Sequence, residues 1–327
     1  PKLSVEPYGR REASLVFNEQ AFKGFPLNDK GDLEKIRVNP AYAYFDRTRY
    51  ISVVDSFLEN VLLFLRPRRF GKSLFLSTLK HFHGVENKHN YEALFRDLDV
   101  DRDVKSGKIT PGQYLIMPFD FSVIDRSPDL DIARNSLNDM LNSAIRAFYM
   151  TYAPYLGTAA SHQLIEDRVS PSALASLADC VNLVQETLNS VRDKDDPLFG
   201  VKGIYLLADE YDAFSNEFLD PNDPRPWEQL RTSPSSLLKG FWGSVKSKLG
   251  ARQIAKCFIT GVSPLSMADN TSGFNVATYV SWRKNLSGLC GLTEEDVLAA
   301  LRLPRVCKSE DEVLRHFKIM KDNYHGY

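Results

Sequence analysis

The segment Val61–Ser73, VLLFLRPRRFGKS, joins an apolar run to a basic turn and a Gly-Lys-Ser tripeptide. Five consecutive apolar residues are typical of a strand that is covered on both faces, as in a parallel sheet. Apolar residues at helical spacing follow at Leu76, Leu79 and Phe82, which predicts a helix over 73–82. A strand, a loop ending in Gly-Lys-Ser and a helix form the arrangement that binds nucleotide phosphates.

The loop departs from the pattern G-x-x-x-x-G-K-[ST], because Arg66 stands where the first glycine is expected. Pro67, Arg68 and Arg69 also crowd the turn. The first glycine serves the geometry of the turn, whereas the N–H donors that contact phosphate come from residues around Gly71. The loop can therefore still bind phosphate. The three arginines could instead form a nucleic-acid patch, but we favour their lining the phosphate site or pairing with local acids.

The composition is that of an ordinary globular protein: 327 residues, 43% hydrophobic and 25% charged, with a net charge of −1. This length predicts one large or two modest domains. The near-neutral charge does not support binding to nucleic acid or to an anionic membrane. No apolar stretch approaches the roughly 20 residues that span a bilayer. We therefore expect an intracellular protein, cytoplasmic or nuclear, without a membrane partner.

The cysteines and histidines show no metal-binding pattern in the sequence. The four cysteines are far apart and form no C-x-x-C pair, which favours buried or idle thiols in a reducing compartment. His81 and His83 lie two residues apart on the expected helix and would point to different faces. We expect structural or surface roles for all six histidines.

Strands alternate with amphipathic helices along the rest of the chain. Further strands are expected at 114–124, 203–208 and 254–260, and helices at 131–153, from Ser170 onward, and at 237–249. Capping boxes of Thr293 with Asp296 and of Ser309 with Glu312 predict two closing helices. The alternation predicts an α/β fold with a mostly parallel sheet flanked by helices. We divide the chain into an irregular lead-in (1–40), a nucleotide-binding core (41–285) and the start of a C-terminal helical subdomain (286–327).

Acidic residues follow the expected strand at 203–208. Ligands of open α/β sheets bind beyond the carboxyl ends of the strands, where the loop and these acids would meet. We expect Lys72 to contact the phosphates, and Ser73 and Asp209 to hold Mg²⁺. Glu210 is placed to orient or deprotonate an attacking water, with Asp212 in reserve.

Polar residues also end the strand at 254–260. Thr260, and after it Ser263, are candidate sensors of a γ-phosphate. Arg252 and Arg283 are candidate arginine fingers, only because they lie near this strand in sequence. Backbone N–H groups are expected to cradle the phosphates at Arg69, Phe70, Gly71, Lys72, Ser73 and Leu74.

The octapeptide RPRRFGKS (66–73) resembles the loop of the AAA-ATPase-like family, predicted P-loop ATPases of fungi, oomycetes and bacteria, in which this form is the family's Walker A motif. The likeness spans about 41–327. Arg47 replaces a lysine and Ala208 a larger aliphatic residue. Residues 271–274 and 289–296 look most like the fungal branch. The matching segments are 43–48, 118–122, 206–212, 258–262, 271–275, 289–296 and 323–327.

The resemblance implies a P-loop NTPase fold that binds ATP and Mg²⁺, with a base-binding wall that includes Phe45, Asp46 and Tyr50. Related modules occur in Crinkler-type effectors, and many family members carry a further C-terminal region that resembles a nuclease. The last residues match a motif that family members carry internally. We therefore expect a fragment of a longer protein that carries or recruits such an output region.

Three functions are compatible with these features. The first is an ATP-hydrolysing switch that controls an attached or bound effector. The second is an ATP-binding sensor or scaffold with little turnover. The third is a phosphotransferase acting on a nucleotide or a nucleic-acid end. The pair Asp209-Glu210 favours the first over the third, because no acceptor pocket is recognisable. The sequence leaves an oligomeric assembly open.

Overall fold

The computed structural model describes residues 15–26, 31–125, 127, 129–157, 165, 168–213, 237–263, 276–303 and 305–324. The family-like segment 271–275 lies outside these residues, as does the end of the segment 323–327.

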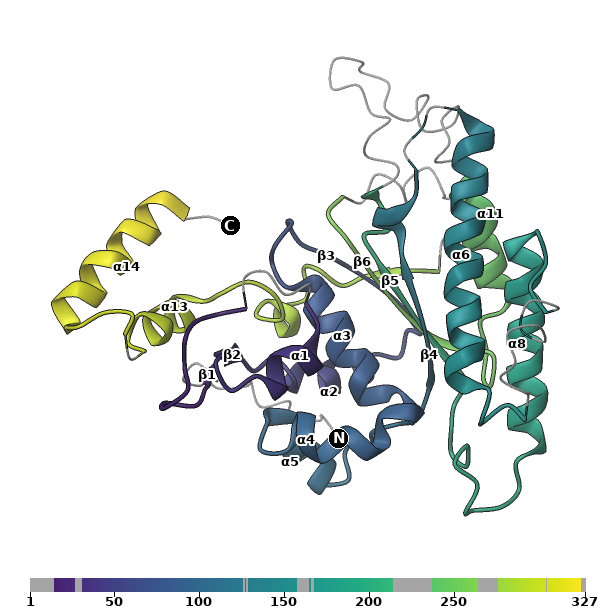
Figure 1. Ribbon diagram of the computed structural model, residues 1–327, viewed down its shortest axis with the longest axis horizontal. Coiled ribbons are helices and arrows are strands. Elements are labelled where there is room, and N and C mark those ends of the chain that lie inside the picture. Colours follow the sequence, from purple (N-terminus) through teal and green to yellow (C-terminus); the bar gives the residue numbers. More distant parts are fainter. Residues whose placement is uncertain are drawn as a thin grey trace, which may run out of the picture.

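A five-stranded parallel sheet forms the centre of the molecule, with strand order β4-β5-β6-β3-β7. Helices flank it on both sides, so the chain has an α/β, P-loop NTPase-like fold, as predicted (Figure 1). The strands are β3 (Val61–Leu65), β4 (Leu115–Asp120), β5 (Ile204–Asp209), β6 (Ile254–Gly261) and β7 (Thr278–Tyr279).

Alternate residues of each central strand enter two separate hydrophobic cores. In β3, Leu63 and Leu65 face one core, whereas Leu62 and Phe64 face the other. Each buried side chain of this kind contributes roughly 1.5–3 kcal/mol to folding. The continuous apolar run in β3 therefore follows from burial on both faces.

Three helices cover the first core: α6 (Leu130–Tyr152), α8 (Ala173–Ser190) and α11 (Leu237–Ser247). The helices on the opposite side are α1 (Leu33–Val38), α2 (Arg49–Asp55), α3 (Lys72–His83), η1 (Val85–Asn90), α4 (Tyr91–Phe95) and α5 (Asp99–Lys105). No helix of the described residues is long and apolar enough to cross a membrane.

The N-terminal segment is more regular than the sequence predicted. Helix α1 lies inside the expected irregular lead-in, and the carboxylate of its N-cap Asp32 accepts the N–H of Glu34 at 3.0 Å. Leu33 and Ile36 are buried in the second core. Strand β1 (Leu15–Val16) pairs antiparallel with β2 (Tyr44–Phe45). The expectation of irregular structure is therefore wrong for these residues.

One strand and one helix have boundaries that differ from those predicted, and the difference is local. The strand expected over 114–124 ends at Asp120, whose carboxylate accepts the N–H of Ser122 at 3.0 Å and turns the chain into η2 (Phe121–Val123). The helix expected from Ser170 begins at Ala173, with Ser172 as its N-cap.

The two closing helices are α13 (Glu294–Leu301) and α14 (Glu310–Tyr324), and the short helix η4 (Lys284–Leu286) precedes them. Thr293 and Asp296 form the predicted capping box. At α14, Ser309 Oγ accepts the N–H of Glu312 at 3.3 Å, but the Glu312 carboxylate accepts from Lys308 instead of Ser309. In Figure 1 both helices lie at the end of the molecule far from α6 and α8.

Candidate functional site

The segments that the sequence predicted to form the site lie together at the carboxyl ends of three adjacent strands. Strand β6 lies between β5 and β3, and Leu65 pairs with Gly261. The loop 66–71, the acids after β5 and the segment 260–263 therefore meet at one edge of the sheet, as expected for a ligand site in an α/β fold.

Left-handed backbone conformations shape the loop before α3. Gly71 has φ 93° and Arg69 has φ 67°. A Cβ on Gly71 would meet nothing within 4 Å, so the glycine serves the backbone conformation and not a close approach. No side chain caps α3 at Gly71, so the first N–H groups of the helix are available to an anion.

Lys72 is buried, with only 5% of its surface exposed, although it carries a charge. Its ammonium donates hydrogen bonds to the carbonyls of Arg66 and Pro67, both at 3.0 Å. A buried charge requires such partners. The side chain therefore lies along the inner side of the loop, where a loop-bound phosphate would be held.

Ser73 and Asp209 form a direct pair across the edge of the sheet. Ser73 Oγ donates to Asp209 Oδ2 at 2.5 Å. Asp209 Oδ1 accepts from Thr260 Oγ at 2.5 Å and from the N–H of Glu210 at 3.0 Å. A hydroxyl and a carboxylate oxygen are hard ligands of the kind that Mg²⁺ uses, with water completing its shell. The residues present therefore fit the predicted magnesium site.

Glu210 follows directly and adopts a left-handed conformation with φ 49°. For a residue other than glycine this costs roughly 1–2 kcal/mol. Within the described part of the chain its carboxylate has no hydrogen-bond or ion-pair partner. The half-buried carboxylate is thus held beside Asp209 and is available for proton transfer.

Thr260 is placed differently from the sequence prediction. It is fully buried, and its hydroxyl donates to Asp209. In this structure the hydroxyl holds the carboxylate of Asp209, and the role as a γ-phosphate sensor stays a prediction.

Asp212 and Ser263, the reserve candidates, hold the backbone after β6. The Asp212 carboxylate accepts the N–H groups of Val262 at 3.0 Å and Ser263 at 2.5 Å. The carbonyl of Ser263 accepts the hydroxyl of Tyr211 at 2.5 Å. Asp212 is buried and its carboxylate is engaged by these donors, and its reserve role as a base stays a prediction.

The three arginines of the loop differ in their contacts. Arg66 donates to the carbonyls of Leu65 and Ser281 at 3.0 Å, and its guanidinium lies 4.7 Å from the centre of the Phe64 ring. It therefore joins β3 to the segment after β7. Arg68 and Arg69 are exposed.

The two arginine-finger candidates lie at opposite edges of the sheet. Arg252 precedes β6 and donates to the Leu188 carbonyl at 3.2 Å, so it lies at the amino edge, away from the loop. Within one chain Arg252 therefore lies away from the loop, and an arginine-finger role for it stays a prediction. Arg283 follows β7 on the carboxyl side and is exposed.

An apolar cavity of about 510 Å³ adjoins the loop. This volume lies in the range of small-molecule sites. Of the predicted base wall, Phe45 lines it, and the ring of Phe25 stacks on Phe45 with centroids 5.7 Å apart. The loop and helix α3 contribute Arg69, Phe70, Gly71 and Leu74. The C-terminal part of the chain contributes residues that the sequence did not reveal: Leu289, Gly291, Leu292, Val297, Leu301, Val306 and Met320.

Asp46 and Tyr50, the other predicted members of the wall, do not line this cavity. The buried Asp46 carboxylate accepts the N–H of Asp99 at 2.6 Å, while Thr48 Oγ accepts that of Val100 at 3.1 Å. These two side chains cap the first turn of α5. The buried Tyr50 hydroxyl accepts from Arg49 at 2.9 Å. Asp46 and Tyr50 are thus engaged in contacts within the fold, and their place in a base-binding wall stays a prediction.

The loop is hydrogen-bonded to the C-terminal part of the chain. The N–H of Gly291 donates to the carbonyl of Phe70 at 2.9 Å. Arg47 donates to the carbonyl of Gly291 at 3.2 Å and forms an ion pair with the buried Asp296 of α13. Phe70 of the loop is therefore linked to α13 in sequence through Gly291 and Arg47.

Comparison with known proteins gives a family and one bacterial relative. A family model described as "Predicted AAA-ATPase" matches residues 31–271. An "Uncharacterized protein in vnfD 5'region" of Azotobacter chroococcum mcd 1 is 28% identical over 279 residues. That match covers 84% of this chain and 45% of the relative, so the chain spans less than half of the relative's length. No solved structure matches.

Proposed function

We propose, since the chain belongs to the predicted AAA-ATPase family, that it binds ATP with Mg²⁺ and hydrolyses it. The observation that carries the proposal is the hydrogen bond from Ser73 to Asp209, with Lys72 buried along the same loop. This brings a hydroxyl, a carboxylate and an ammonium group to one edge of the sheet. Phosphoryl transfer depends mainly on such positioning and charge stabilisation.

In this proposal the phosphates lie on the N–H groups of residues 69–74, and the base lies in the adjoining cavity against Phe45, Phe70 and Leu74. Lys72 exchanges the loop carbonyls for phosphate oxygens. Ser73 and Asp209 hold the magnesium ion, which neutralises developing charge on the phosphates. The apolar lining suits the two faces of a purine ring.

Glu210 is the proposed base. A strained conformation next to a metal-binding acid is a pattern found at functional sites, where the surrounding structure must maintain it. Its carboxylate would orient the attacking water and accept its proton. Three donors fix the carboxylate of Asp209 beside Ser73, and we assign this acid to the metal and not to the water.

The proposed output is a conformational switch that acts on an attached or bound effector region, for which a nuclease is one candidate. It is supported by the hydrogen bond between Phe70 and Gly291 and by the ion pair between Arg47 and Asp296. The first connects the phosphate loop to Gly291, and Arg47 in turn connects Gly291 to Asp296 of α13. An ATP-binding sensor with little turnover would use the same connections without hydrolysis, whereas a phosphotransferase would need an acceptor group beside the loop.

The test combines calorimetry of ATP binding with single-turnover release of phosphate. Wild-type chain should bind Mg·ATP and release phosphate, whereas Lys72→Ala should lose binding. Lys80→Ala is the matched control, because Lys80 lies exposed on the same helix. Equal ATP affinity in Lys72→Ala and wild type would refute the site. Binding without phosphate release would favour the sensor.

A further inference from the structure

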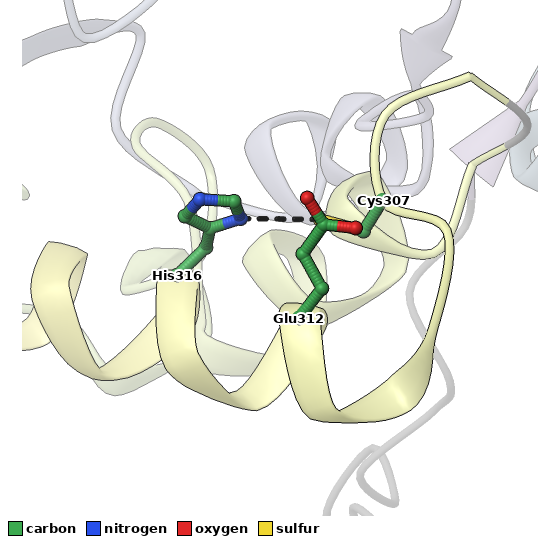
Figure 2. A group of neighbouring side chains, drawn as sticks. All are labelled: Cys307, Glu312 and His316. Carbon is green, nitrogen blue, oxygen red and sulfur yellow. Dashed lines mark hydrogen bonds between the residues drawn. The ribbon is translucent and has the colours of Figure 1, made fainter.

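Three side chains of different chemistry meet at the start of α14. Glu312 and His316 lie one turn apart on the same face of the helix, and Cys307 lies on the segment before it (Figure 2). One ligand atom from each residue lies within 4.8 Å of those of the other two. Cys307 Sγ and His316 Nδ1 lie 3.4 Å apart.

We propose that Cys307, Glu312 and His316 form a binding site for a divalent transition-metal ion of the zinc class. Thiolate, imidazole and carboxylate are the three ligand types that zinc sites use. Bond lengths of about 2.0–2.3 Å in a tetrahedron place ligand atoms roughly 3.3–3.8 Å apart. The sulfur and nitrogen already meet this spacing, and a carboxylate oxygen of Glu312 lies within 4.8 Å of both.

The backbone orients the carboxylate of Glu312. Its Oε2 accepts the N–H of Lys308 at 2.8 Å, and the N–H of Glu312 donates to Ser309 Oγ at 3.3 Å. Ligating carboxylates commonly carry such a hydrogen bond on one oxygen, with the other left for the metal. All three ligands are half-buried, so an ion from solvent can reach them and water can complete the coordination.

The thiol must lose its proton to bind the ion. Partial burial and the neighbouring Glu312 carboxylate raise the pKa of the Cys307 thiol. Metal binding therefore releases a proton, and the affinity should fall as the pH is lowered.

The bound ion would fix a wall of the apolar cavity. Val306, which precedes Cys307, and Met320, one turn after His316, both line the cavity. Cross-linking the segment before α14 to the helix would hold both residues in place. The site is accordingly assigned a structural role in the C-terminal part of the chain.

The experiment is a titration of metal-free full chain with Co²⁺, using protein purified without a histidine tag. We expect one ion per chain, with the absorption of a cobalt–thiolate bond, and displacement of the ion by Zn²⁺. Cys307→Ser should lose that absorption. Glu312→Gln and His316→Gln should weaken binding by at least roughly tenfold, the smallest loss seen when even an outer-shell partner is removed. The matched control is His89→Gln, because His89 is exposed on a different element.

Two results would overturn the site. One is the absence of cobalt–thiolate absorption in the wild type, in which case the thiol and the imidazole only share a hydrogen bond. The other is unchanged absorption in Cys307→Ser, because the ion would then bind one of the buried thiols Cys180, Cys257 or Cys290. Circular dichroism of each variant establishes that the comparison is made between folded chains.

Discussion

Ser73 on α3 donates its hydroxyl hydrogen to the carboxylate of Asp209 at the end of β5, at 2.5 Å, across 136 residues of sequence. The contact exists because β6 separates β3 from β5 by one strand, so the loop after β3 and the end of β5 meet at the same edge. Thr260 at the end of the intervening β6 holds the second oxygen of the same carboxylate. The three strands thus position one acid jointly.

Ser73→Ala should weaken magnesium-dependent binding of ATP by at least about tenfold, since a hydroxyl ligand is lost. Binding of ATP without magnesium should change little, because the N–H groups and Lys72 remain. Ser73 is exposed, so the fold should be intact. Calorimetry with and without Mg²⁺ measures both quantities, and Ser247→Ala, an exposed serine of α11, is the control. Equal losses with and without Mg²⁺ would place Ser73 outside the metal site.

Glu210→Gln should bind ATP as the wild type does and hydrolyse it about 10²–10⁴-fold more slowly, because the base is removed while the shape is kept. Single-turnover phosphate release measures the rate. Glu186→Gln, an exposed residue of α8, should retain the wild-type rate. If Glu210→Gln turns over normally, the base is another group.

Thr260→Val distinguishes positioning of Asp209 from direct contact with phosphate. The substitution removes the hydroxyl at nearly constant volume, and the lost hydrogen bond to a charged group is worth roughly 1.5–3 kcal/mol. If Thr260 positions Asp209, magnesium affinity and hydrolysis fall together, and Thr260→Ser restores both. A loss of hydrolysis at unchanged magnesium affinity would support the sensor role that the sequence suggested.

The parts of the site that could be predicted from sequence are those that lie next to a strongly patterned element. The apolar strand β3 and the tripeptide 71–73 identify the loop, and Asp209 follows an equally apolar strand. Because the carboxyl ends of parallel strands share one edge, their meeting follows from the fold class. The pair Ser73–Asp209 was foreseeable on these grounds.

The parts that were missed depend on long-range packing. The side chains of Asp46 and Phe45 are adjacent in sequence, yet one caps α5 and the other lines the cavity. Helix α1 has only six residues, too few to show a helical period, and is stabilised by burial of Leu33 and Ile36. The cluster of Cys307 with His316 has no recognised spacing, and only the turn before α14 brings the two together.

Gly261→Ala should destabilise the fold. A Cβ at this position would lie 2.6 Å from the ring of Tyr211 and would also meet the buried carboxylate of Asp212. Overpacking of this kind costs typically 1–3 kcal/mol. Gly243→Ala is the matched control, because Gly243 lies within α11 with nothing within 4 Å of an added Cβ.

In the control variant Gly243→Ala, the free energy of unfolding should rise by up to about 1 kcal/mol, because alanine favours a helix more than glycine does. Urea denaturation of both variants measures the two changes, which should have opposite signs. A wild-type midpoint for Gly261→Ala would show that the chain after β5 can move away. The close approach of Tyr211 would then not be the reason for a glycine at position 261.

The stability of the chain should fall in mildly acidic solution because of His83. This histidine is fully buried among Tyr114, Tyr205 and Phe82, and neither ring nitrogen has a hydrogen-bond partner within the described residues. Burial lowers the pKa of His83 from 6.5 to about 4, which the Asp55 carboxylate 3.5 Å away opposes and Lys256 and Lys202 reinforce.

Between these two pKa values the unfolded chain binds more protons at this site than the folded chain does. The free energy of unfolding should therefore be highest above pH 6.5 and decrease as the pH falls toward about 4, by up to about 3 kcal/mol from this residue.

His83→Phe keeps an aromatic ring and removes the titration, so its unfolding free energy should depend less on pH. His81, whose pKa is lowered chiefly by burial, leaves a residual slope. Urea denaturation at several pH values measures how the unfolding free energy changes with pH, with His89→Gln as the exposed control. If this change is the same in His83→Phe and in the wild type, the pKa of His83 does not differ between the folded and unfolded chain.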